Sequence, residues 1–194
     1  MIQKIASTVT EHLISNGTIN RDVSSIYQYG LELLTSSLLG ALLIIAFGAI
    51  LFNSVYALIF LFCFIALRSF CGGFHASSYF RCTLSSLLTF LIVAVLSRYT
   101  PVNIFALLII LISCIISLSI TAPVENEYKP IDNANRRKFK IITLLICFLL
   151  SFISAIIYFY NIYYASVIVY SISSVSVLAI FGKSVQNKKL KNNH

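Results

Sequence analysis

A thiol and an imidazole stand seven residues apart in the stretch LRSFCGGFHASSYFRC, residues 67–82. Cys82 can supply a nucleophilic sulfur, and His75 can supply the base that activates it. Arg68 and Arg81 flank the pair and can favour the thiolate through their positive charge. These residue types predict a cysteine nucleophile with its base, in a chain whose remaining sequence is mostly apolar.

The spacing of His75 and Cys82 requires a bend between them. In a straight α-helix, seven residues separate two positions by about 10.5 Å along the axis, which is too far for a hydrogen bond. Gly72 and Gly73 supply the backbone freedom for such a bend. We therefore expect residues 74–77 to fold back over the start of the helix that carries Cys82, where the helix dipole also favours a thiolate.

Other interpretations of the same residues stay open. Cys71 and His75 have the spacing of neighbours on one helix face and could form half of a metal site. No second cluster of ligands completes four, so we expect no metal ion. Arg68 and Arg81 could serve only as positive anchors at a membrane surface.

The composition places these residues in a membrane protein. The 194 residues are 59% hydrophobic and only 10% charged, whereas a soluble domain carries about 25% charged residues. The apolar runs are continuous and do not alternate as in a β-barrel strand. The net charge of +8 is spread between these runs, without the basic face that binds nucleic acid. We expect an all-α integral membrane protein that binds no nucleic acid and needs no cofactor.

Six runs are long enough to span a bilayer, after an N-terminal amphipathic helix in residues 1–16. The expected spans are approximately 33–52, 55–67, 83–96, 102–122, 139–160 and 162–181. We expect one polytopic domain over 1–194, made of interfacial amphipathic helices (1–30), transmembrane helices (33–182) and a basic tail (183–194).

The basic residues indicate how the chain is oriented. With both termini in the cytoplasm, Arg98 alone of the 14 lysines and arginines falls outside. Cytoplasmic loops carry an excess of lysine and arginine, so a thirteen-to-one split predicts that the 68–81 turn and the 122–140 loop are cytoplasmic. The expected location is a bacterial plasma membrane.

The five cysteines form no evident disulfide framework. Cys63, Cys114 and Cys147 lie inside apolar runs, where a free thiol behaves as a small hydrophobic side chain. Cys71 and Cys82 are the two that we expect water and charge to reach.

The chain resembles the accessory gene regulator B family in two motifs. The first is GGFHA followed by five residues and Cys82, and the second is APVENEYKP at 122–130. Its members are membrane cysteine endopeptidases of quorum-sensing systems in Gram-positive bacteria, and the likeness extends over nearly the whole chain. The resemblance implies that Cys82 is the nucleophile and His75 its base, with Arg68 and Gly73 also required. It further implies cleavage of a small AgrD-type propeptide through a thioester that promotes its cyclisation to an autoinducing peptide.

The basic run after the second motif, together with Arg81, suits the binding of an acidic cytosolic peptide. Arg136, Arg137 and Lys138 are the candidates to hold such a substrate, although membrane lipid is an equally good partner. A homodimer is left open. The alternative functions are a non-enzymatic transporter or export component, or a signalling scaffold. Against transport, we expect Glu32 to be interfacial, so that no acid is buried in a span.

We predict that a cysteine introduced at Asn133 is protected from a membrane-impermeant thiol reagent added to intact cells, because the 122–140 loop is cytoplasmic. Labelling of permeabilised cells gives the control. Fast labelling of intact cells would contradict the six-span arrangement with cytoplasmic termini.

Overall fold

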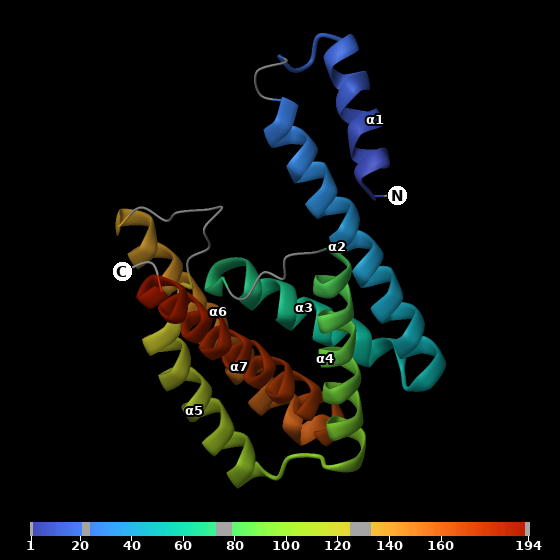
Figure 1. Ribbon diagram of the computed structural model, residues 1–194. Helices are drawn as coiled ribbons and strands as arrows, with labels where there is room; N and C mark the ends of the chain where they lie inside the picture. Colours follow the sequence, from blue (N-terminus) through green and yellow to red (C-terminus); the bar gives the residue numbers. More distant parts are fainter. Residues whose placement is uncertain (1, 21–23, 73–78, 125–132, 193–194) are drawn as a thin grey trace.

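The computed structural model describes residues 2–20, 24–72, 79–124 and 133–192, which form seven helices and no strand (Figure 1). The helices are α1 (Ile2–Ser15), α2 (Ser24–Leu51), α3 (Ser54–Cys71), α4 (Tyr79–Tyr99), α5 (Ile104–Thr121), α6 (Asn133–Tyr160) and α7 (Ile162–Asn192). Helices α2 to α7 each contain at least 18 residues of high mean hydropathy, enough to cross a membrane. The predicted fold class is confirmed: six membrane-length helices follow an N-terminal helix.

Asparagines mark the starts of three helices. The side chain of Asn53 accepts a hydrogen bond from the Val55 amide before α3, at 2.9 Å, and Asn103 does the same for α5. Asn161 accepts from the amide of Tyr163 at the start of α7, at 3.0 Å. These side chains satisfy amides that have no partner within the helix. The breaks predicted at Asn53 and Asn161 are confirmed.

Several helices are longer than the apolar runs that predicted them. Helix α3 continues four residues past the predicted end at 67, and α4 begins at Tyr79, four residues before the predicted start at 83. Helix α7 continues to Asn192, so the residues expected as a basic tail extend the last helix. Hydropathy locates the membrane core, whereas lysine, asparagine and glutamine can continue a helix into water.

Helix α7 is the centre of the bundle. It packs against α3, α4, α5 and α6, and 61% of its span is buried, compared with 39% or less for every other span. Val167, Val169 and Ile172 on α7 are fully buried. The hydroxyl of Ser166 on α7 accepts from the Val102 amide at 3.0 Å, which fixes the α4–α5 turn to this helix. Polar contacts of this kind satisfy backbone groups where water is scarce.

Helix α2 meets α3 and α4 through small residues. Ser36, Gly40 and Gly48 are buried on one face of α2 at intervals of four or eight residues. A methyl group at Gly48 would lie only 2.6 Å from Cβ of Ala57 on α3. Small residues let helix backbones approach closely in a membrane, which explains why this face of α2 is the packed one.

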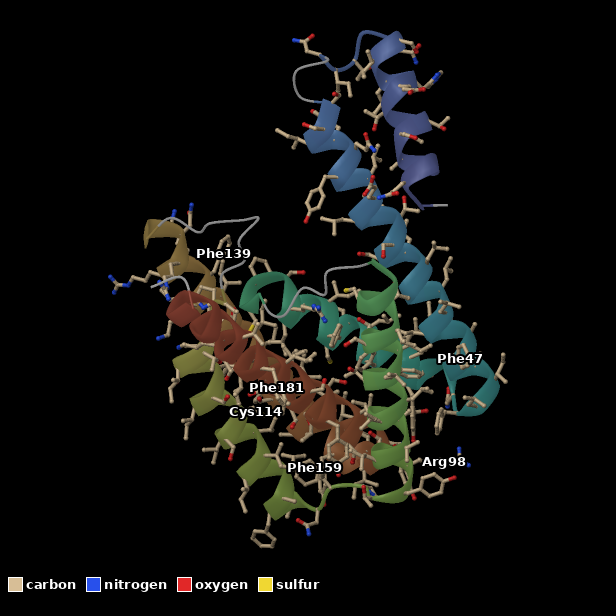
Figure 2. The ribbon with its side chains drawn as sticks, viewed as in Figure 1. Phe47, Arg98, Cys114, Phe139, Phe159 and Phe181 are labelled. Carbon is tan, nitrogen blue, oxygen red and sulfur yellow. The ribbon has the colours of Figure 1, made fainter. Side chains whose placement is uncertain are left out.

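Figure 1 shows the ends of α3, α5 and α7 together with the start of α6 on one side of the bundle, and the start of α4 apart from them beside α2. Phe139, within the basic start of α6, lies at this end, and Arg98 lies at the opposite end (Figure 2). The bundle therefore separates Arg98 from the basic residues near Phe139, as the sequence-based orientation requires.

Candidate functional site

Arg68 and Cys82 contact each other across two helices. Arg68 lies in the last turn of α3, Cys82 is the fourth residue of α4, and Arg68 Nη2 donates to Cys82 Sγ at 3.9 Å. The guanidinium carbon also lies 5.2 Å from the ring centroid of Phe64, one turn earlier on α3, in a cation–π contact. Phe64 thus helps to hold the positive charge of Arg68 beside the sulfur.

The thiol of Cys82 has a second source of positive potential. As the fourth residue of α4, it lies at the end of the helix where backbone N–H groups lack helical acceptors. The helix dipole places about half a positive charge there. A guanidinium and a helix N-terminus therefore both lie beside this one sulfur.

Cys82 is half-buried, whereas the other four cysteines are buried. Cys63, Cys114 and Cys147 pack in the apolar core, as predicted. The expectation that water reaches Cys71 is wrong, because this side chain is 0% exposed. Helix α3 ends at Cys71, and His75, with which Cys71 was expected to share a helix face, lies outside the described residues. Cys82 is therefore the accessible thiol.

Gly72 connects this pair of helices to the chain after α5. The Val124 amide donates to the Cys71 carbonyl at 2.9 Å, and Gly72 and Val124 form an isolated parallel β-bridge. Gly72 has φ +70° and ψ −158°, a region that only glycine adopts readily. Its own amide donates back to Arg68, at 3.2 Å. The glycine motif and the start of the APVENEYKP motif thus form one structural unit.

A basic pocket of about 300 Å³ lies at the same end of the bundle. Its lining consists of residues 120–123 after and within α5, Arg136, Arg137 and Lys140 on α6, and Lys183 on α7. Lys183 Nζ donates to the carbonyl of Ile120 at 2.7 Å. Two of the three predicted substrate-loop residues line this pocket. Lys138 does not, and Lys183 was missed because its place beside α6 depends on tertiary packing.

Other predicted site residues lie outside the described part. His75 and Gly73 lie outside the described residues, and so do residues 74–77, for which a fold-back was predicted. The side chain of Arg81 is also not described. Within the described ranges, no three histidine, cysteine, aspartate or glutamate side chains gather as metal ligands would.

Glu32 is buried in α2, a helix long enough to cross a membrane. It is 8% exposed and accepts a hydrogen bond from Gln28 Nε2 at 3.2 Å. It lies one turn before Ser36, whose hydroxyl is 3.5 Å from that of Thr83, the residue after Cys82. The lack of a buried acid no longer argues against transport, but this carboxylate lies on the α2 face that packs against the start of α4.

The family model of accessory gene regulator B matches residues 3–181. A protein of Clostridium perfringens strain SM101, described as AgrB-like, is 28% identical over 174 residues, covering 83% of this chain and 80% of its own. An AgrB-like protein of Clostridium beijerinckii is 33% identical over 156 residues, covering 75% of this chain and 73% of its own. No solved structure matches.

We predict that iodoacetamide alkylates Cys82 first among the five thiols, because Cys82 alone among them is half-exposed and beside a guanidinium. Peptide mapping of the full-length protein in detergent after timed alkylation measures the order. Cys71→Ser should leave the fast phase intact, and Cys82→Ser should remove it. Equal rates at Cys71 and Cys82 would contradict the difference in burial.

Gly72→Ala should destabilise the protein by about 1–3 kcal/mol, because alanine is strained at this φ and ψ. Its Cβ would also overlap the Val124 carbonyl oxygen. The matched control is Gly30→Ala, since a Cβ there meets nothing within 4 Å and φ is ordinary. The measurements are the unfolding midpoint and the alkylation rate of Cys71, which should rise in the Gly72 variant only. A Gly72→Ala protein as stable as the Gly30 variant would show that the bridge is dispensable.

Proposed function

Because the chain belongs to the accessory gene regulator B family, we propose that it is a membrane cysteine endopeptidase that cleaves a small quorum-sensing propeptide of the AgrD type. Cys82 is the nucleophile and His75 its base. The observation that carries this proposal is the 3.9 Å contact between Arg68 and the half-buried Cys82, at the end of the bundle where both family motifs meet. The same residues carry the sequence resemblance.

The reaction consists of two acyl transfers. The Cys82 sulfur attacks the carbonyl carbon of the scissile peptide bond, an S–C bond forms, and the C–N bond breaks. His75 takes the thiol proton and delivers it to the leaving amine. The C-terminal fragment leaves, and the N-terminal part remains on Cys82 as a thioester.

The thioester keeps the acyl group activated for ring closure. A thiol or hydroxyl within the bound peptide attacks the thioester carbon, and Cys82 leaves as a thiolate. Covalent capture divides a difficult transpeptidation into two easier steps, and holding both reacting groups on one peptide raises their effective concentration.

Arg68 has an electrostatic role in this scheme. Its guanidinium stabilises the negative charge that develops on the Cys82 sulfur as His75 removes the proton, and again as the thioester opens. The Phe64 ring holds the guanidinium of Arg68, and the Gly72 amide donates a hydrogen bond to the backbone carbonyl of Arg68. Gly73 is proposed as a supporting residue from the family pattern, and Arg81 is proposed as one because its positive charge is adjacent to Cys82 in the sequence.

The proposed setting is a bacterial plasma membrane with both chain termini in the cytoplasm. The site then faces the compartment that holds the propeptide and keeps Cys82 reduced. This orientation is supported by the separation of Arg98 from the basic end of the bundle (Figure 2).

We predict that Cys82→Ser and His75→Asn abolish processing when the protein is co-expressed with the peptide encoded by a short reading frame beside its gene. Cys71→Ser is the matched control and should process normally, because its side chain is fully buried and out of reach of a substrate. Arg68→Gln should slow processing by about tenfold, the factor that 1.4 kcal/mol of lost charge interaction gives. Arg68→Lys should recover part of that rate.

Mass spectrometry of wild-type protein mixed briefly with peptide should find the N-terminal fragment on Cys82 as an adduct that hydroxylamine removes. Processing by Cys82→Ser at the wild-type rate would overturn the peptidase mechanism and favour a transporter or a scaffold, neither of which needs this thiol.

A further inference from the structure

We propose that Glu32 on α2 is a positioning residue for the peptidase reaction, because its carboxylate accepts a hydrogen bond from the ring of His75. The inference rests on the proposed function, in which His75 takes the proton of the Cys82 thiol. A cysteine nucleophile and its histidine base are often completed by a third group that orients the base. The contacts between α2 and α4 point to Glu32 as that group.

Glu32 is a buried carboxylate with little to compensate its burial. It is 8% exposed, and it accepts a hydrogen bond at Oε1 from Nε2 of Gln28, at 3.2 Å. Within the described ranges, no second group bonds to this carboxylate. Burial of a carboxylate costs free energy unless a cation or several donors compensate it. One neutral amide compensates little, so the carboxylate can accept a stronger bond from a charged donor such as protonated imidazole.

Helices α2 and α4 run in the same direction where they pack together. The hydroxyl oxygens of Ser36 on α2 and Thr83 on α4 lie 3.5 Å apart. Further along both helices, a Cβ at Gly48 would lie 3.3 Å from Cζ of Phe90. Both helices therefore advance together from the first contact to the second, and Figure 1 shows the start of α4 beside α2.

This parallel packing places Glu32 at the level where the chain enters α4. Glu32 is one turn before Ser36 on α2, and Tyr79, the first residue of α4, is one turn before Thr83. Cys82 directly precedes Thr83 in the first turn of α4. The buried carboxylate thus lies on the side of α2 that faces the start of the helix carrying the nucleophile.

The covalent chain keeps His75 near this level. His75 precedes Tyr79 by four residues, and an extended chain spans at most about 3.6 Å per residue, so the two Cα atoms are no more than about 14 Å apart. Imidazole and glutamate side chains both reach outward from their backbones, which shortens the gap that they must cross. A hydrogen bond between His75 and Glu32 is therefore compatible with the connectivity.

Few other acids are available for this role. No aspartate or glutamate lies between Leu33 and Val124. Of the two acids that the structure describes, Glu11 is exposed on α1, and Glu32 is buried on a helix packed against α4. Asp22 and the acids of 125–132 lie outside the described residues, so they are compared with Glu32 by experiment.

The proposed role is both geometric and electrostatic. One ring nitrogen of His75 takes the thiol proton, and the N–H of the other donates to the Glu32 carboxylate, which fixes the tautomer and the orientation of the ring. The ring becomes a cation when it takes the proton, and the nearby carboxylate stabilises that charge. The proton stays on His75 until the leaving amine takes it, so Glu32 itself is not protonated.

The test is a double-mutant cycle measured by the rate at which iodoacetamide alkylates Cys82 in the full-length protein in detergent, without peptide. Alkylation requires that the thiol proton leave, so the rate reports proton removal by His75. Glu32→Gln should slow it by about tenfold, the factor that 1.4 kcal/mol gives, and Glu32→Asp should slow it less. In a His75→Ala protein, Glu32→Gln should cause no further slowing, because the base through which Glu32 acts is gone.

Ser36→Ala is the matched control for this cycle. Ser36 lies on the same buried face of α2, one turn from Glu32, and contacts α4. Its replacement should leave the alkylation rate of Cys82 unchanged with and without His75. The unfolding midpoint of each variant shows whether the packing of α2 against α4 is retained.

Equal slowing by Glu32→Gln in the presence and absence of His75 would overturn the proposal. That result would show a structural role for the carboxylate, such as an ion pair with Lys4 on α1 or Arg81 on α4, whose side chains are not described. A His75→Ala protein alkylated as fast as the wild type would also overturn it, because Glu32 would then have no base to position.

The acids outside the described residues give the remaining comparison. A His75-dependent effect of Asp22→Asn, Glu125→Gln, Glu127→Gln or Asp132→Asn, with none for Glu32→Gln, would assign the role to that acid and overturn the proposal. Because the cycle uses no peptide, its result is independent of cleavage. Failure to cleave the propeptide would refute the proposed function and leave the measured coupling between Glu32 and His75 as it is.

Discussion

Gly72 can pair with Val124 because it has no side chain: its φ of +70° and the overlap of any Cβ with the Val124 carbonyl exclude other residues. This backbone contact joins the end of α3 to the chain after α5, two parts separated by about fifty residues of sequence. Arg68 lies one turn before Gly72, and the pocket-lining residues 120–123 lie directly before Val124. The bridge adds a backbone link to the packing of α3 against α6 and α7.

Helix α7 sets the geometry on which this arrangement depends. It contacts α3, α4, α5 and α6, so it fixes the positions of Arg68, Cys82, the end of α5 and the start of α6 at once. Lys183, near its end, bonds to α5 across the pocket. A helix that carries many buried small and branched residues can take this central place because close packing replaces the hydrophobic effect between helices in a membrane.

Two kinds of electrostatic effect operate at this end of the bundle. At Cys82, one guanidinium and one helix N-terminus act on a single sulfur. In the pocket, four cationic side chains from α6 and α7 line a wider space. Buried Glu32 adds a carboxylate on the face of α2 that packs against the start of α4.

The sequence by itself determined the fold class, the number of spans and the breaks at Asn53 and Asn161, because apolar length and helix caps are local properties. It also identified Cys82 and Arg68, since a thiol and an arginine interrupt apolar runs there. It could not decide between Cys71 and Cys82 as the accessible thiol, because burial depends on which helix covers each side chain. Tertiary packing likewise decided three further features: the exposure of Glu32, the exclusion of Lys138 from the pocket, and the place of Lys183 beside α6. Packing brings together residues that are far apart in the sequence, so their spacing along the chain does not predict these contacts.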